Sequence, residues 1–341
     1  MNVMKMNVHD FMNVEGNTYA ITNAIAKAWD ILGRFERPLV SVSGGSDSDI
    51  VMDMIYRLDD TGKVRYGWFN TGLEWDATKR HLRFLEEKYG VEIIRFQPVK
   101  PVAWVVKNWG YPFSSKYASY CLYTLIKHGY DFRGDSTYER DIQEFHGCKD
   151  GLDWWYSTHD RALWNISVTH YLRDFLVQYP PKILISDKCC HYTKKLPSER
   201  MHRSGDYDLQ IIGVRRFEGG VRSNFRNCFV TSERKGNRFM PILHFTNADK
   251  ARYNELYGIE NSDCYTVYGF ARTGCAGCPY NRFMLRDLNN PILQEYEPGL
   301  LKAARAVFQP AYDYTELYSK YCEARYILDG RADERYRLFR Q

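Results

Sequence analysis

The residues that most clearly suggest a binding or catalytic site form a short stretch rich in glycine and hydroxyl groups, Ser41-Val42-Ser43-Gly44-Gly45-Ser46-Asp47-Ser48-Asp49-Ile50. An apolar run precedes it and an apolar-periodic segment follows it, so the pattern predicts a strand, a loop and then a helix. Glycines let the backbone approach an anion closely, and hydroxyls and a helix N-terminus donate hydrogen bonds to it. We expect a phosphate site here, with a plain tight turn as the alternative. Its candidate ligand-binding residues are Ser43, Gly44, Gly45, Ser46, Asp47 and Ser48.

Cysteines form the second chemical feature. The chain of 341 residues has nine cysteines, including the adjacent pair Cys189-Cys190 and the CxxC pair Cys275 and Cys278. Inside a cell, thiols are kept reduced, so cysteines at such spacings favour metal or redox chemistry over disulfides.

The elements that must position these residues alternate between strands and helices. We expect an amphipathic helix over residues 18–35, strands over 64–69 and 91–96, and a helix over 75–89 between those strands. Strands that alternate with helices of this length predict parallel βαβ units, in which ligands lie at the carboxyl ends of strands. The sequence therefore predicts an α/β fold with a mostly parallel, doubly wound sheet.

Charge and composition limit the class of protein. The net charge is +5 with 26% charged and 16% aromatic residues, and the sequence pI is about 8.6. This mild basicity suits an anionic ligand such as a nucleotide, but it is too weak to require DNA or RNA. No run of 18 apolar residues and no signal pattern at the amino terminus is present, so we expect a cytoplasmic protein without a membrane partner.

Several motifs together resemble the family of phosphoadenosine phosphosulfate (PAPS) and adenosine phosphosulfate (APS) reductases. The SGGxDS pattern is similar to the PP-loop of that family and of the ATP pyrophosphatases, and not to the GxxxxGK[ST] loop of kinases. Asn70-Thr71-Gly72 with Thr78 resembles the DTGxxFxET segment, with Asn70 where the family commonly has aspartate. The resemblance implies nucleotide-binding roles for Thr71 and Gly72. The alternative interpretation is a turn without a binding role.

The cysteine segments carry the same resemblance. Residues 189–197 are similar to the CCxxxKxxP segment of the iron–sulfur branch, and Cys275 and Cys278 are similar to its CxxC. Adjacent thiolates can each reach a different iron of a [4Fe–4S] cluster, whereas they are an awkward pair for one tetrahedral zinc. Lys194 stands where the family has a lysine beside the cluster, and a solvated lysine is the alternative. The expected metal ligands are Cys189, Cys190, Cys275 and Cys278.

An arginine-rich loop follows a predicted strand at residues 209–212. It resembles the GxRRxExxxR segment of the family, in which arginines hold the anionic end of the nucleotide. The resemblance implies that role for Arg215, Arg216 and Arg222. Taken alone, such a loop would be a solvated surface more often than a site.

The remaining segments organise the chain around this core. We predict an N-terminal helix within residues 1–37, a PP-loop domain over 38–280 with an aromatic-rich insertion at about 104–180, and a helical C-terminal cap over 281–341. Within the insertion we expect a surface segment at 130–158, a helix over 160–178 and aromatic side chains that pack in the core more often than they stack on bases. Helices are also expected over 300–308 and 315–328.

These features favour an iron–sulfur enzyme of sulfur chemistry that binds an adenine nucleotide, ATP or APS/PAPS, with Mg²⁺ as an accompanying ion. The nucleophilic ECGxH tail of the reductases is missing, so we lean to ATP-dependent activation with sulfur transfer, as in relatives that thiolate tRNA or DNA. The partners would then be a sulfur donor and a nucleic-acid acceptor. The alternatives are a reductase that uses Cys322 or the thiol of a thioredoxin-like partner, and a non-catalytic regulator that binds nucleotide or nucleic acid.

Overall fold

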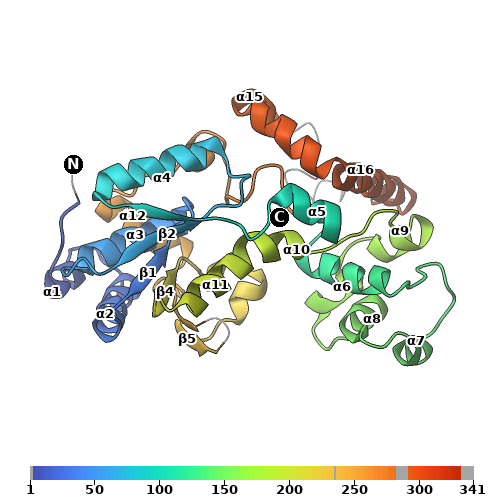
Figure 1. The fold of residues 1–341 in the computed structure, drawn as a ribbon, viewed down its shortest axis with the longest axis horizontal. Coiled ribbons are helices and arrows are strands. Elements are labelled where there is room, and N and C mark those ends of the chain that lie inside the picture. Colours follow the sequence, from blue (N-terminus) through green and yellow to red (C-terminus); the bar gives the residue numbers. More distant parts are fainter. Residues whose placement is uncertain (1–2, 234–235, 282–290, 332–341) are drawn as a thin grey trace. The chain divides into compact units, whose positions relative to one another are not determined.

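The computed structural model describes residues 3–233, 236–281 and 291–331 (Figure 1). The chain folds into two compact units, and each is made from two segments of the sequence. The first unit contains residues 1–99 and 193–273, and the second contains residues 100–192 and 274–341. The predicted insertion at 104–180 therefore falls within the second unit, together with the C-terminal helices, whereas the predicted domain ranges stay a prediction.

A six-stranded sheet forms the centre of the first unit. Its strands lie in the order β3-β2-β1-β4-β6-β5, and all neighbouring pairs are parallel except β5 with β6. The predicted α/β fold with a mostly parallel sheet is confirmed. The strands are β1 (Pro38–Ser41), β2 (Arg65–Phe69), β3 (Ile93–Phe96), β4 (Leu209–Ile212), β5 (Phe229–Ser232) and β6 (Gly236–Phe239).

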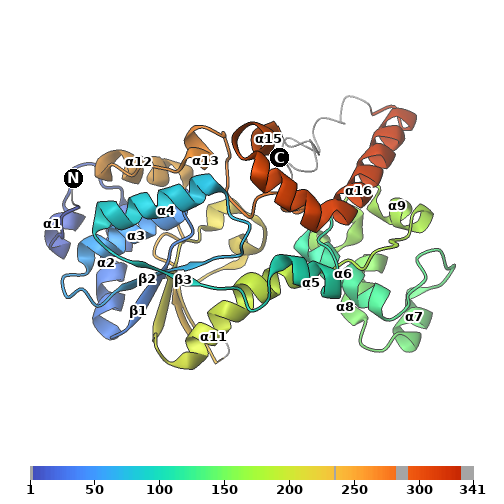
Figure 2. The ribbon, with the colours of Figure 1, turned by 45° about the horizontal axis from the view of Figure 1, so that its top comes forward.

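Helices pack around this sheet (Figure 2). In α2, residues Ile21, Ile25 and Ala28 recur at helical spacing and are buried, and Thr18 caps the first turn by accepting a hydrogen bond from Ile21 N at 3.3 Å. The helices of this unit are α1 (Val8–Met12), α2 (Tyr19–Arg34), α3 (Ser46–Leu58), α4 (Asp76–Tyr89), α11 (Leu196–Ser204), α12 (Asn247–Tyr257) and α13 (Asp263–Thr266), with 3-10 turns at Arg216–Glu218 and Gly220–Asn224.

The second unit is helical among its described residues. Its core includes Phe113, Leu122, Leu152, Trp155 and Phe175, all nearly inaccessible to solvent. Its helices are α5 (Val102–Trp109), α6 (Lys116–Lys127), α7 (Tyr138–Glu144), α8 (Lys149–Tyr156), α9 (Leu172–Gln178), α10 (Lys188–Cys190), α15 (Pro291–Tyr296) and α16 (Pro298–Leu328), with 3-10 turns at Ala162–Trp164 and Ile166–Val168 and a π-helical segment at His191–Lys195 that runs into the first unit.

Three local predictions are corrected here. The surface segment predicted over 130–158 is exposed over most of residues 131–150, but its last part belongs to the core, because α8 buries Leu152, Trp154 and Trp155. The helix predicted over 160–178 is interrupted before α9: the Asn165 amide bonds the backbone of His159 at 3.0 and 3.1 Å, which competes with helix formation. The two predicted C-terminal helices are one helix, α16.

Candidate functional site

The loops that follow β1 and β4 meet at one edge of the sheet. β1 lies between β2 and β4, and the chain order reverses there, because β2 and β3 lie on one side of β1 and β4 to β6 on the other. In open α/β sheets, such a switch point at the carboxyl ends of strands is where ligands bind. The first loop is the predicted phosphate loop, and the second carries the predicted arginines.

The phosphate loop is held in shape by the hydroxyl of Ser48. Ser48 Oγ donates to Gly45 O at 2.7 Å and accepts from the backbone N–H groups of Ser43 and Gly45, both at 3.2 Å. Helix α3 therefore begins at Ser46, four residues before the predicted apolar-periodic segment. Gly44 adopts a left-handed φ of 66°, and a Cβ there would lie 2.9 Å from Thr78 Cγ2, so the loop needs glycine at this position.

The second loop touches the first through a glycine without a side chain. A Cβ on Gly213 would lie 2.8 Å from the backbone of Asp47 and Ser48. This close approach brings the segment after β4 against the first turn of α3. The contact explains how residues more than 160 positions apart in the sequence come to share one site.

Asp47 joins cations from two directions. Arg215 Nε donates to Asp47 Oδ2 at 2.9 Å, and Lys250 Nζ lies 2.9 Å from Asp47 Oδ1. The side chains of Arg215 and Lys250 are 7% and 21% exposed, so both pairs are largely shielded from water. Since removing one partner of a shielded ion pair is costly, these contacts fix the cations beside the loop.

More positive charge lies next to this pair. Arg222 contacts Glu218, and Arg272 Nε lies 4.0 Å from the other oxygen of the same carboxylate. Burial and the positive charge of Arg272 lower the pKa of Arg222 to about 10. An anion bound beside Arg222 would relieve both effects. Arg216, the third predicted arginine, is exposed.

Two residues that the sequence did not indicate contact the phosphate loop. Lys250, on α12, also donates a short hydrogen bond to Ser46 Oγ. Tyr265, on α13, accepts a hydrogen bond from Ser46 N at 3.2 Å through its hydroxyl. No local pattern signals either residue, because each lies about 200 positions beyond the loop.

A buried acid lies behind the loop. Asp49 Oδ2 is 2.8 Å from His81 Nε2, and both side chains are nearly inaccessible to solvent. Burial raises the pKa of Asp49, and its contact with His81 opposes the rise. This pair links the first turn of α3 to α4, so it supports the loop from the protein interior.

The predicted nucleotide-binding residues after β2 have internal partners. Thr71 is buried, and its hydroxyl and backbone N–H both donate to the Glu74 carboxylate, at 2.8 Å for the hydroxyl. Gly72 is exposed, and its N–H donates to Asn70 Oδ1 at 2.8 Å. The segment is thus a side-chain-stabilised turn, which positions an exposed glycine at the carboxyl end of β2.

The four predicted cysteine ligands all belong to the second unit. Burial raises the pKa of Cys278 to about 12, and the negative charges of Cys275 and Cys190 add to the rise. The two cysteine segments are therefore close enough to interact electrostatically. Cys189 precedes Cys190 on α10 and is buried, whereas Lys194 is exposed and belongs to the first unit.

The local packing around the CxxC pair is tight. Gly277 has a left-handed φ of 65°, and a Cβ there would overlap Ala304 Cβ and approach the Tyr312 hydroxyl. Tyr312 donates a short hydrogen bond to Gly277 O, and Tyr280 donates to Ser186 O at 3.2 Å. These contacts tie the CxxC segment to α16 on one side and to the segment before α10 on the other.

Coordination of one ion and coordination of a cluster make different demands on these thiols. Within the described ranges, no three side chains of the types His, Cys, Asp and Glu converge as ligands of a single metal ion would. Each ligand of a [4Fe–4S] cluster binds its own iron, so its four sulfurs do not have to converge on one point. The thiols of Cys190, Cys275 and Cys278 interact electrostatically, and Cys189 neighbours Cys190 on α10. These four thiols fit the donor set of a cluster.

Cys322, the candidate nucleophile of the reductase alternative, lies outside the four candidate ligands. All nine cysteines lie in described residues, and none forms a disulfide. Cys322 is 4% exposed, its thiol donates to His170 O at 3.8 Å, and burial raises its pKa to about 11. A reactive cysteine needs exposure and a lowered pKa, so Cys322 lacks both properties.

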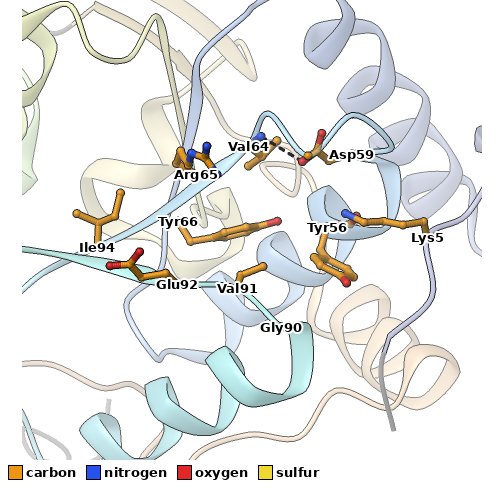
Figure 3. A pocket seen from close by; sticks show the side chains of 11 residues that line it. Lys5, Tyr56, Asp59, Val64, Arg65, Tyr66, Gly90, Val91, Glu92 and Ile94 are labelled. Atoms are coloured by element: carbon orange, nitrogen blue, oxygen red, sulfur yellow. Dashed lines mark hydrogen bonds between the residues drawn. The ribbon is translucent and has the colours of Figure 1, made fainter.

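Two cavities lie elsewhere in the first unit. One of about 490 Å³ is lined by Lys5, Tyr56, Tyr66 and Glu92, among others, at the amino-terminal ends of β2 and β3 (Figure 3). The other, of about 240 Å³, lies between α4 and the edge strand β3. Neither is lined by the phosphate loop or by the arginines after β4.

Comparison with known proteins supports the family resemblance. Residues 152–281 match the family model of the phosphoadenosine phosphosulfate reductase domain, which confirms the resemblance predicted from the motifs. The matched segment contains the four candidate cysteine ligands, Lys194 and the arginines, and the phosphate loop at residues 43–48 precedes it. No curated protein matches the chain.

Solved structures of low sequence identity align with most of the chain. PAPS reductase from Candida auris aligns over 81% of this chain and 97% of its own, with 11% identity and a TM-score of 0.40. The FMN adenylyltransferase of Candida glabrata, in complex with FMN and an ATP analogue, covers 79% and 68%, with 10% identity and a TM-score of 0.40. The U34-tRNA thiolase NcsA of Methanococcus maripaludis, with its [4Fe-4S] cluster, covers 87% and 80%, with 14% identity and a TM-score of 0.36.

Among the described helices, none combines the length and the apolar composition that crossing a bilayer requires.

Proposed function

We propose that this chain is a PAPS-reductase-like enzyme that binds an adenine nucleotide at the phosphate loop and performs sulfur chemistry. One observation carries the proposal: Arg215 and Arg222 lie with Asp47 at the switch point of a parallel sheet, beside a glycine-rich loop that opens a helix. This combination provides hydrogen-bond donors and positive charge for an anionic ligand. The match to the reductase domain model supports an adenine nucleotide as that ligand.

The charge of the site favours a polyphosphate. Among the described residues, four cationic side chains, Arg215, Arg222, Arg272 and Lys250, pair with two carboxylates, those of Asp47 and Glu218. Two positive charges therefore remain in excess among these groups, and the Arg222 side chain is only 32% exposed, so water screens that excess incompletely. A nucleotide with several phosphate charges, alone or with Mg²⁺, would offset it.

ATP-dependent activation is the reaction that we favour. An oxygen of the acceptor attacks the α-phosphorus of ATP, the bond from that phosphorus to the bridging oxygen breaks, and pyrophosphate leaves with the electron pair. Arg215 and Arg222 would stabilise the charge that develops on pyrophosphate, because Arg215 is already held by Asp47 of the loop and Arg222 by Glu218. A sulfur nucleophile from a donor would then displace AMP from the acceptor, for which a nucleic acid is our first candidate.

The thiols of Cys189, Cys190, Cys275 and Cys278 would hold a [4Fe–4S] cluster in the second unit. With all four irons held by thiolates, a bound cluster would supply electron transfer. The chain's own contribution is to bring two thiol pairs together: α10 carries one pair, and Tyr312 and Tyr280 hold the segment that carries the other.

A sulfonucleotide reductase is the second candidate, since the domain model that matches is named for that activity. Such a reaction needs a thiolate that attacks sulfur. The burial and raised pKa of Cys322 make it a poor nucleophile, so a thioredoxin-like partner would have to provide the thiol.

Parallel turnover assays test the proposal. Anaerobically purified protein is incubated with ATP, APS or PAPS, with and without tRNA or DNA, and pyrophosphate, AMP and sulfite are measured. We expect pyrophosphate and AMP from ATP, reduced about 10- to 100-fold in Arg222→Gln, because one charge-assisted contact is lost. Release of sulfite from APS or PAPS would instead show that the protein is a sulfonucleotide reductase. Tight binding without any product would contradict both and favour a regulator.

A further inference from the structure

Lys250 lies next to the phosphate loop, and none of the sequence motifs accounts for a cation at this position. Helix α12 presents it in its first turn, four residues after the N-cap Thr246. The capping box fixes that turn: Thr246 Oγ1 accepts from Asp249 N at 3.2 Å, and Asp249 Oδ2 accepts from Thr246 N at 2.9 Å. Asp249 also accepts a hydrogen bond from Thr18 on the opposite side, at 2.7 Å. The backbone that carries Lys250 is therefore rigidly held.

The ammonium group of Lys250 reaches the first turn of α3. It donates to Ser46 Oγ and lies 2.9 Å from Asp47 Oδ1, and its side chain is 21% exposed. Asn247, three residues earlier on α12, accepts from Arg215 at 3.0 Å. The start of α12 thus contacts the loop and the arginine that pairs with it, so α12 is a third wall of the site.

A lysine ammonium has three N–H donors and no acceptor. Within the part of the chain that the structure describes, Ser46 Oγ takes one of these donors, and Asp47 Oδ1 is an ion-pair partner at 2.9 Å without a hydrogen bond to the ammonium. At least one N–H therefore remains for a ligand, and the ammonium that carries it is within hydrogen-bond reach of the hydroxyl of Ser46, a residue of the predicted phosphate loop. A lysine that only stabilises the fold does not require partial exposure or an unused N–H donor beside the loop, whereas a lysine that binds a ligand requires both.

From this geometry we infer that Lys250 is a substrate-binding residue, which donates a hydrogen bond from its ammonium to a phosphate oxygen of the nucleotide. The inference rests on the proposed function, because it assigns a ligand contact within the same site. Asp47 then has a defined role as well: it orients Lys250 from one oxygen and Arg215 from the other. The site thereby receives two cations that are placed before the phosphate arrives, which lowers the cost of ordering them on binding.

Binding measurements on full-length variants test this inference. The variants are Lys250→Gln, which removes the charge but keeps an N–H donor on the side chain, and Lys250→Arg, which keeps the charge. Lys27→Gln is the matched control, since Lys27 is an exposed lysine of α2 in the same unit. Dissociation constants are measured by calorimetry for ATP, inorganic pyrophosphate and adenosine, and the melting temperature of each variant is measured without nucleotide.

A phosphate contact predicts a pattern that depends on the ligand. Lys250→Gln should weaken the binding of ATP and of pyrophosphate about 10- to 100-fold, the range for loss of a hydrogen bond to a charged group. The dissociation constant for adenosine should stay within twofold of wild type. Lys250→Arg should recover most of the loss, and Lys27→Gln should bind as wild type does.

Two results would overturn the inference. Equal binding of ATP by wild type and Lys250→Gln would remove Lys250 from the ligand while the proposed function stands. An equal loss for adenosine and ATP, or a melting temperature reduced in step with the affinity, would make Lys250 a structural residue of the loop. If wild type bound none of ATP, pyrophosphate, APS and PAPS, the proposed function itself would be wrong.

Discussion

Replacing Gly213 with alanine tests how closely the two loops of the candidate site must approach. The new Cβ would lie 2.8 Å from the carbonyl carbon and oxygen of Asp47 and from Ser48 N. All three are backbone atoms in a turn that the Ser48 hydroxyl already holds, so the loop cannot yield without losing hydrogen bonds. Overpacking of this kind costs about 1–3 kcal/mol of unfolding free energy.

The substitution should also weaken nucleotide binding. Any shift that relieves the overlap moves Asp47 relative to Arg215, which donates to it at 2.9 Å. For units of 150–250 residues, about 1 kcal/mol corresponds to roughly 2–4 °C in melting temperature. We therefore expect Gly213→Ala to melt about 2–12 °C lower than wild type and to bind ATP more weakly, measured by calorimetric melting and titration.

A matched control separates crowding from a general effect of alanine. A Cβ on Gly33, an exposed residue in α2, would meet no atom within 4 Å. Gly33→Ala should therefore stabilise the chain by about 0.5–1 kcal/mol, through helix propensity, and leave ATP binding unchanged. If Gly213→Ala melted and bound ATP as Gly33→Ala does, the close approach of the loops would not exist in solution.

Three further predictions concern the cysteines, the capping of α12 and the second core. Cys275→Ser should abolish visible absorbance and reduce iron content in anaerobically purified protein, whereas Cys228→Ser, at a half-buried cysteine outside the candidate set, should keep both; unchanged iron in Cys275→Ser would refute the ligand assignment. Burial alone would raise the pKa of Asp249, but hydrogen bonds from Thr18 and Thr246 lower it below the usual 3.8. The stabilisation that the Asp249 carboxylate contributes to the fold should therefore be complete above about pH 5 and should fall as the pH drops through 3.8 and below. Denaturant unfolding from pH 3 to 7 should show that Asp249→Asn removes this dependence; parallel curves for both proteins would contradict it. Phe175→Ala should cost about 3–5 kcal/mol, since Phe175 is fully buried in the second unit, and a loss below 1 kcal/mol would show that this core is loosely packed.

The sequence predicts most of what is local in this fold. The strand at residues 209–212 is found within its predicted bounds, and the helix over 18–35 is found as α2. Both depend on apolar periodicity and capping over a short range, which are readable from neighbouring residues. The phosphate loop is predictable for the same reason, since its glycines and hydroxyls are contiguous.

The elements that were predicted wrongly depend on particular contacts. The apolar pattern over 160–178 is helical, but the Asn165 amide binds the backbone of His159, and Tyr171 adopts a left-handed φ of 52° just before α9. The segment 130–158 has mixed charges and glycines, yet its tryptophans pack against α6 and against Phe132.

The candidate site was only partly predictable because half of it is assembled over long distances in the sequence. Arg215 was indicated by its motif, but Lys250 and Tyr265 reach the loop from helices that no local signal connects to it. Only the packing of α12 against α3 and of α13 against α4 brings them there. Long-range contacts of this kind are set by the topology of the sheet and cannot be read from one sequence.

The most direct test of this account is titration of ATP into the anaerobically purified full-length chain. We expect saturable binding of one ATP per chain, weakened at least tenfold in Arg222→Gln and unaffected in Lys27→Gln. Absence of saturable binding for ATP, APS and PAPS alike, by protein that melts cooperatively, would contradict the assignment of the phosphate loop as a nucleotide site.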